Sequence, residues 1–100
     1  NAIRDFSLGQ NFPNPFNPST TIQFIVGKSA KVFVVLFDVT GKEVTTLVND
    51  SKDAGSYSVS WNGRTSSGAQ AASGTYFYRM LAVAGDGSTS IETKKMTLLK

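Results

Sequence analysis

With 100 residues, 40% of them hydrophobic, the chain is the size of one globular domain, and it contains no apolar run of the ~20 residues that would span a bilayer. It has neither cysteine nor histidine, which excludes disulfides and thiolate sites and removes the most common general base and transition-metal ligand, so we do not expect an enzyme. The net charge of +3 comes from lysines and arginines that are mostly scattered singly, so we expect no nucleic-acid partner, which would require a clustered basic face.

All three prolines of the chain fall in one early segment, residues 11–18, which reads NFPNPFNP. Each proline fixes φ and lacks an N–H, and each residue before a proline is pushed toward an extended conformation. We therefore expect a stiff, extended segment that cannot extend a sheet edge, with Phe12 and Phe16 as its anchors into the core. Residues 1–10 are expected to be a linker from a preceding domain, accessible to a processing peptidase, and residues 11–100 the folded domain.

Two strands are predicted after the proline segment. Residues 21–26 (TIQFIV) alternate in polarity, which is typical of a half-buried strand. Residues 31–39 (KVFVVLFDV) are apolar on both faces, which is typical of a central strand. Its second face, made by Phe33, Val35 and Phe37, is expected to be covered by the proline segment, a loop or another copy of the domain, so self-association is a possible outcome.

The rest of the chain continues as short strands separated by turns. Thr40 and Gly41 predict a hairpin turn, and the broken alternation of residues 43–48 (EVTTLV) predicts a β-bulge. Residues 56–61 (SYSVSW) alternate, so Trp61 is expected in the core rather than stacked on a sugar. A Gly/Ser/Ala loop, the alternating segment 75–84, a GDG turn and a last strand follow. Six or seven strands at this spacing predict an antiparallel sandwich. The predicted core consists of Ile22, Phe24, Val32, Val34, Leu36, Tyr57, Val59, Trp61, Tyr76, Tyr78 and Met96.

No motif predicts catalysis or a bound cofactor or metal. Most of the seven acidic residues fall at predicted turns, where aspartate stabilises the turn by bonding its own backbone, so a pair of catalytic carboxylates is not expected. Asn49, Asp50 and Asp53 could offer oxygen ligands to calcium, but their spacing differs from that of a calcium loop, and an exposed polar loop is favoured. The stretch GRTSSG lacks the patterns of a nucleophile elbow or a phosphate loop.

Five segments, in order, resemble a known family. They are QNFPNPFNPSTTIQF, VVLFDVTGKEVTTLV, the W-N-G-R and S-G-T-Y-F-Y-R motifs within residues 55–80, and ETKKMTLLK. Together they resemble the type A C-terminal sorting domain of cargo proteins of the bacterial type IX secretion system, over about residues 8–100. The positions that match the family motifs are Asn14, Pro15, Phe16, Asn17, Pro18, Asp38, Gly41, Trp61, Gly63, Gly74, Tyr76, Tyr78, Lys95 and Met96.

The resemblance implies an all-β, immunoglobulin-like antiparallel β-sandwich of about seven strands that follows an N-terminal cargo domain. It implies a non-catalytic module that passes through the periplasm and directs its parent across the outer membrane of a Gram-negative bacterium, to be secreted or held at the cell surface. The implied partners are the type IX secretion machinery and a sortase-like surface peptidase that removes the domain.

A candidate recognition surface lies near the end of the chain. Its exposed polar residues are expected to be Arg79, Lys94, Lys95, Thr97 and Lys100. Lysines on a terminal strand have an equally good second explanation, since charge on an edge strand discourages aggregation.

An alternative function from another class remains open at this point. The chain could be an accessory immunoglobulin-like module, carbohydrate-binding or spacer, of an extracellular hydrolase, and flagellar hook-capping proteins carry a similar domain. A carbohydrate-binding module should present an exposed aromatic platform, whereas most aromatic residues here are predicted in the core.

Overall fold

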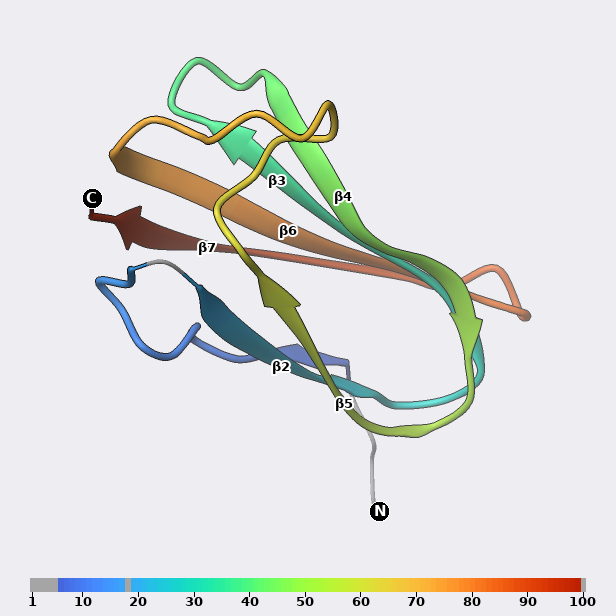
Figure 1. The fold of residues 1–100 in the computed structure, drawn as a ribbon. Coiled ribbons are helices and arrows are strands. Elements are labelled where there is room, and N and C mark those ends of the chain that lie inside the picture. Colours follow the sequence, from blue (N-terminus) through green and yellow to red (C-terminus); the bar gives the residue numbers. More distant parts are fainter. Residues whose placement is uncertain (1–5, 18, 100) are drawn as a thin grey trace.

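A computed structural model describes residues 6–17 and 19–99, and this part of the chain is built entirely of strands and connecting loops (Figure 1). The strands are β1 (Ser7–Leu8), β2 (Thr20–Val26), β3 (Ala30–Asp38), β4 (Glu43–Lys52), β5 (Gly55–Trp61), β6 (Gly74–Ala84) and β7 (Thr89–Leu98). Within the described residues there is no helix that could cross a membrane. The predicted all-β fold is confirmed.

The strands form two antiparallel sheets that pack face to face as a sandwich (Figure 1). One sheet has the order β4-β3-β6-β7 and the other the order β1-β2-β5. Buried and exposed positions alternate along β2, so that Ile22 and Phe24 are buried while Gln23 and Ile25 face outward. The inward residues of both sheets meet in one hydrophobic core.

The core contains the predicted residues together with others that were not predicted. Every predicted core residue is buried except Tyr57 and Val59, which are half-buried and pack against the others. Leu8 also belongs to the core, at 2% exposure, although it lies in the stretch expected to be a linker. Residues 6–10 are therefore part of the sandwich, whereas residues 1–5 of the expected linker lie outside the described part of the chain.

The predicted irregularity of β4 is confirmed. The register between β3 and β4 shifts between Val34 and Val35 and again between Leu36 and Phe37. These shifts explain why the apolar residues of β4 do not alternate strictly, because each extra residue exchanges the face that the following side chains take.

The second apolar face of β3 lies on the outer surface of the four-stranded sheet. Phe33, Val35 and Phe37 are half-buried there. The proline segment does not cover them, since it pairs with Thr21 of β2 and with Leu98 at the end of β7. Instead, the Lys31 ammonium lies 5.7 Å from the Phe33 ring centroid, and the Arg79 guanidinium lies 4.7 Å from that of Phe37. The rings are thus shielded in part by cationic side chains of their own sheet.

Candidate functional site

The proline segment links β2 to the end of β7. Phe12 forms an isolated bridge with Thr21, and Phe16 forms one with Leu98. The Phe16 side chain is 1% exposed, as predicted for an anchor, but Phe12 is 79% exposed, so its prediction as an anchor is wrong. Paired residues of an antiparallel bridge share one face, and Thr21 lies on the outward face of β2, which turns the Phe12 ring outward too.

Hydrogen bonds tie the proline segment to the last strand. The Thr97 backbone N–H donates to Asn14 Oδ1 at 3.0 Å, and the Phe16 N–H donates to the Thr97 carbonyl at 3.0 Å. The Leu99 N–H donates to the Phe16 carbonyl at 2.9 Å. The outer edge of β7 is therefore closed near its end by residues 14–16, and a family motif from the start of the domain is joined to one from its end.

A buried polar cluster holds the chain just before the prolines. The Tyr78 hydroxyl donates to the Gly9 carbonyl at 2.7 Å and accepts from the Asn11 N–H at 2.8 Å. Asn11, only 2% exposed, donates from Nδ2 to Thr20 Oγ1 at 3.0 Å and to the Pro13 carbonyl at 3.1 Å. Burial raises the pKa of Tyr78 above its ordinary value. Sequence reasoning missed Asn11, because polar residues near prolines are usually exposed.

Trp61 is the centre of an aromatic cluster. Its indole ring lies 5.6 Å from Phe16 and 5.3 Å from Tyr76, measured between centroids. Its Nε1–H donates to the Arg64 carbonyl at 2.8 Å, and the Tyr76 hydroxyl donates to the Ala72 carbonyl at 2.6 Å. The indole N–H of Trp61 and the hydroxyl of Tyr76 therefore both bond to the loop of residues 62–73, which connects the two sheets.

The turn between β3 and β4 is organised by Asp38. Its Oδ1 accepts hydrogen bonds from the Thr40 hydroxyl at 2.6 Å, the Thr40 N–H at 2.9 Å and the Lys42 N–H at 3.1 Å. The Thr40 hydroxyl, more than the other donors, lowers the pKa of Asp38. Gly41 has a φ of +86°, in the region that favours glycine. The two motif residues of this turn, Asp38 and Gly41, thus have a structural role.

All of these motif segments gather at one end of the sandwich, which we call the motif end. Figure 1 shows there the end of β7, the beginning of β6, the β3–β4 turn and the loop that holds the prolines. The strand registers agree, because Asp38 pairs with Tyr76, Tyr76 pairs with Met96 and Thr20 pairs with Trp61. We define the motif end as residues 11–17, 38–42, 61–63, 74–78 and 95–98. Two predicted residues, Pro18 and Lys100, lie outside the described part of the chain.

The predicted recognition residues do not form a single surface. Arg79, Lys95 and Thr97 share the outer face of the four-stranded sheet. Lys94 pairs with the inward-facing Tyr78 and lies 3.7 Å from the Glu92 carboxylate, on the other side of β7. Alternation along a strand separates consecutive lysines in this way.

A hollow lies next to Arg79 on the outer face. It has a volume of about 280 Å³ and is lined by Phe37, Asp38, Val39, Gly41, Phe77 and Arg79. Val39, at the tip of the turn, is 67% exposed. This side of the motif end therefore combines apolar side chains with the carboxylate of Asp38 and the cations Arg79 and Lys95.

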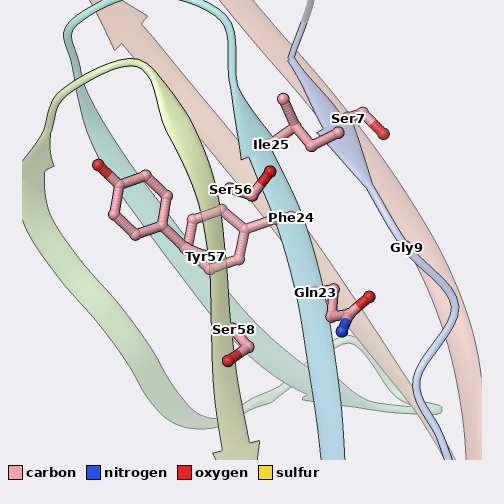
Figure 2. A pocket seen from close by; sticks show the side chains of 8 residues that line it. All are labelled: Ser7, Gly9, Gln23, Phe24, Ile25, Ser56, Tyr57 and Ser58. Atoms are coloured by element: carbon pink, nitrogen blue, oxygen red, sulfur yellow. The ribbon is translucent and has the colours of Figure 1, made fainter.

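A second hollow, of about 400 Å³, lies on the three-stranded sheet between β1 and β5 (Figure 2). Hydroxyl and amide side chains line it, among them Gln23, Ser56 and Ser58. Tyr57 does not offer a platform for a sugar there, because its ring is stacked on Phe24 at 5.6 Å between centroids. Within the described ranges, no three acidic, histidine or cysteine side chains lie together as a metal site would require.

Comparison with known proteins identifies the kind of domain. Residues 16–86 match the family of the FlgD Ig-like domain. Among curated proteins, none matches the chain.

Solved structures share the fold. Dimeric latent PorU from Porphyromonas gingivalis superposes with a TM-score of 0.78 at 22% identity, over 98% of this chain and 10% of PorU. FlgD from P. aeruginosa superposes with a TM-score of 0.65 at 27% identity, over 79% of this chain and 61% of FlgD. PorZ, a surface component of the type IX secretion system of Porphyromonas gingivalis, superposes with a TM-score of 0.57 at 22% identity, over 91% of this chain and 11% of PorZ. The chain thus spans less than two thirds of each of these proteins.

Proposed function

The chain belongs to the FlgD Ig-like domain family, and within that family we propose that it is a non-catalytic sorting domain, which directs a larger cargo protein across the outer membrane through the type IX secretion system. Its chemistry is recognition, and it needs neither a cofactor nor a metal. A sortase-like surface peptidase removes it after transport.

One observation carries this proposal. The proline motif and the terminal strand are joined by the hydrogen bond from the Thr97 N–H to Asn14 Oδ1 and by the two backbone bonds of Phe16. In this proposal the secretion machinery recognises a folded surface of the domain. A surface that joins the start of the domain to its end exists only when the whole sandwich is folded.

The comparisons support the proposal at the level of the fold. PorZ belongs to a type IX secretion system, and both PorU and PorZ contain this sandwich as about a tenth of a longer chain. A sorting domain would likewise be a small module within a larger protein. This context is the basis for proposing an extracytoplasmic location, reached through the periplasm.

The recognition surface in this proposal is the outer face beside the motif end. Arg79, Lys95 and Thr97 lie on it with the half-buried Phe37 and Phe77, and Val39 projects from its border. Aromatic residues and arginine are enriched at protein contact sites, so Phe37, Phe77 and Arg79 give this patch a composition that suits such a contact. Lys94 is left out of this surface because it faces the other side of β7.

The proposed cleavage falls before Ser7. β1 pairs with β2 through Ser7 and Leu8, and the Leu8 N–H donates to Glu92 Oε1 at 3.0 Å. A peptidase needs an extended segment free of such pairing, so a cut within β1 would require part of the sandwich to open.

The test is export of a carrier protein fused to residues 1–100 in a host with a type IX system. We expect the carrier at the cell surface, where added protease degrades it on intact cells, and we expect it in the periplasm of a host without the system. The same fusion lacking residues 93–100 should stay in the periplasm. Equal export of a truncated fusion that still folds would place the signal elsewhere.

A second function, that of a structural spacer, is favoured by one observation. The family match is to a domain of FlgD, and a FlgD from Xanthomonas campestris with this fold is described in terms of hook capping in flagellar assembly. A sugar-binding role has less support, since Phe12 is the one exposed aromatic side chain in the described part of the chain. If the full fusion is never exported, the spacer function becomes the better proposal.

A further inference from the structure

The two sheets have four outer edges, and three of them are protected against pairing with another strand. The edge of β7 is closed by Asn14 and Phe16, and Gln10 Nε2 donates to the Lys95 carbonyl at 2.8 Å. β1 has only two residues, and its Leu8 N–H is bonded to Glu92. The edge strand β4 has two register shifts and several charged residues, and its Val44 carbonyl accepts from the Ser66 N–H. Bulges, charges, short strands and covering segments are the usual protections of edge strands.

The fourth edge, that of β5, has no bulge and no charged residue of its own, although the Lys52 ammonium of β4 lies 4.9 Å from the Tyr57 ring centroid. Its sequence, GSYSVSW, contains no charged residue and no proline. Its pairing with β2 runs without a shift from Thr20–Trp61 to Val26–Gly55. On its outer side, the described part of the chain supplies no backbone hydrogen bond to Gly55–Trp61. Among the described residues, therefore, the outward-pointing N–H and C=O groups of this strand have no backbone partner, which makes the edge a template for another strand.

The core is also open along this edge. A hollow of about 360 Å³ lies between β4 and β5, with Leu47, Val48, Tyr57 and Val59 in its lining. These four side chains are half-buried although they pack against the core. On the other side of the sandwich, the edges of β1 and β7 are bonded to each other through Leu8 and Glu92. The β5 side is thus where the sandwich lacks a covering element.

We propose that a second copy of this chain covers the β5 edge, by antiparallel pairing of β5 with β5 of the partner about a two-fold axis at Ser58. This proposal does not depend on the sorting function. Ser58 is the middle residue of β5, so an axis there pairs Tyr57 with Val59 of the partner subunit and Ser56 with Ser60 of the partner subunit.

The strand pattern is complementary to itself in this arrangement. The paired serines face outward on both copies, and the aromatic and β-branched pair faces the core, a combination that stabilises antiparallel strands. No like charges meet within the strand pair, because β5 carries none. Two three-stranded sheets would join into one sheet of six strands, and the two open hollows would face each other across the axis. An isologous contact of this kind closes on itself and stops at a dimer.

The first test measures the mass of the domain in solution by analytical ultracentrifugation, from micromolar to millimolar concentration. We expect a monomer–dimer equilibrium. The variant Ser58→Lys places two ammonium groups opposite each other, roughly 5 Å apart between Cα atoms, and should weaken the dimer about tenfold or more. The control is Gln23→Lys on β2, at the position paired with Ser58 and equally exposed. Its two charges would lie roughly 14 Å apart across the axis, so the control should dimerise as the wild type does.

The second test uses the absence of cysteine from the chain. In the proposed dimer, Ser58→Cys brings two thiols to the distance that a disulfide bridges, whereas Gln23→Cys does not. Under mild oxidation, Ser58→Cys should become a covalent dimer and Gln23→Cys should stay monomeric. The proposal is overturned if the wild type stays monomeric and Ser58→Cys crosslinks no faster than the control. It is equally overturned if a dimer forms that Ser58→Lys does not weaken, since such a dimer would use another face.

Discussion

Asn14 and Thr97 lie 83 positions apart in the sequence and are joined by a hydrogen bond of 3.0 Å from the Thr97 backbone N–H to Asn14 Oδ1. This bond occupies an N–H that an edge strand would otherwise expose. Asn14 Oδ1 accepts this bond, and Phe16 completes the contact, because its N–H donates to the Thr97 carbonyl and its carbonyl accepts from the Leu99 N–H. The proline segment therefore covers the edge of the terminal strand through residues 14 and 16.

Replacing Asn14 should loosen this cover. In Asn14→Ala, the Thr97 amide loses its partner, and we expect its hydrogen exchange to accelerate and the domain to lose about 0.5–1.5 kcal/mol of stability. The control is Asn17→Ala in the same motif, which is also exposed and should leave both quantities unchanged. Equal effects in the two variants would mean that the hydrogen bond has no such role.

Tyr78→Phe tests the buried polar cluster. Removing the hydroxyl leaves the Asn11 N–H and the Gly9 carbonyl without their partner, so we expect a loss of about 1–3 kcal/mol in chemical denaturation. Phe77→Tyr, which adds a hydroxyl at a half-buried site on the outer face, should change stability much less. A Tyr78→Phe domain as stable as the wild type would show that residues 9–11 are held by other contacts.

Trp61→Ala should be among the most destabilising substitutions. The indole is 2% exposed and contacts Phe16 and Tyr76, so its loss should cost ~3–5 kcal/mol. Val39→Ala, at an exposed turn position, should stay within about 0.5 kcal/mol of the wild type. An unchanged melting temperature for Trp61→Ala would contradict the placement of the indole in the core.

The turn between β3 and β4 should make stability depend on acid. The pKa of Asp38 is lowered in the folded state by the Thr40 hydroxyl, so the folded state binds this proton less readily than the unfolded one. The stability that Asp38 contributes is present above its unfolded pKa of about 3.9 and is lost as the pH falls below that value. In Asp38→Asn, the free energy of unfolding should fall less over the same pH range. If the two proteins lose stability equally as the pH falls, Asp38 does not cause the loss.

Several features of the fold follow from local patterns. Alternation along residues 21–26 and 56–61 predicts both strands and their buried faces, because the period of two is a property of the strand itself. The broken pattern of residues 43–48 predicts the bulge of β4 for the same reason. The prediction that Phe16 is an anchor is confirmed, since its buried ring packs against Trp61, but the same pattern did not distinguish it from the exposed Phe12.

Other features depend on partners far along the chain. Asn11 is buried because Tyr78, 67 positions away, places its hydroxyl against the Asn11 N–H, and no local pattern encodes that distance. Phe12 turns outward because of its bridge with Thr21, which sets the face that the ring takes. Lys94 and Lys95 separate because the register with β6 decides which of the two faces the core.

The most direct test of the sorting proposal exchanges charges on the outer face without disturbing the core. In the carrier fusion, Arg79→Glu with Lys95→Glu reverses the two exposed cations beside the motif end, and Lys28→Glu with Lys31→Glu reverses two exposed cations at the opposite end of β3. Both pairs change the net charge equally, and melting curves of the purified domains would verify folding. The quantity to measure is the fraction of carrier degraded by protease on intact cells. The proposal predicts that the fusion with Arg79→Glu and Lys95→Glu is retained in the periplasm, whereas the fusion with Lys28→Glu and Lys31→Glu is exported like the wild type. Export of the first pair at the wild-type level would contradict the central claim.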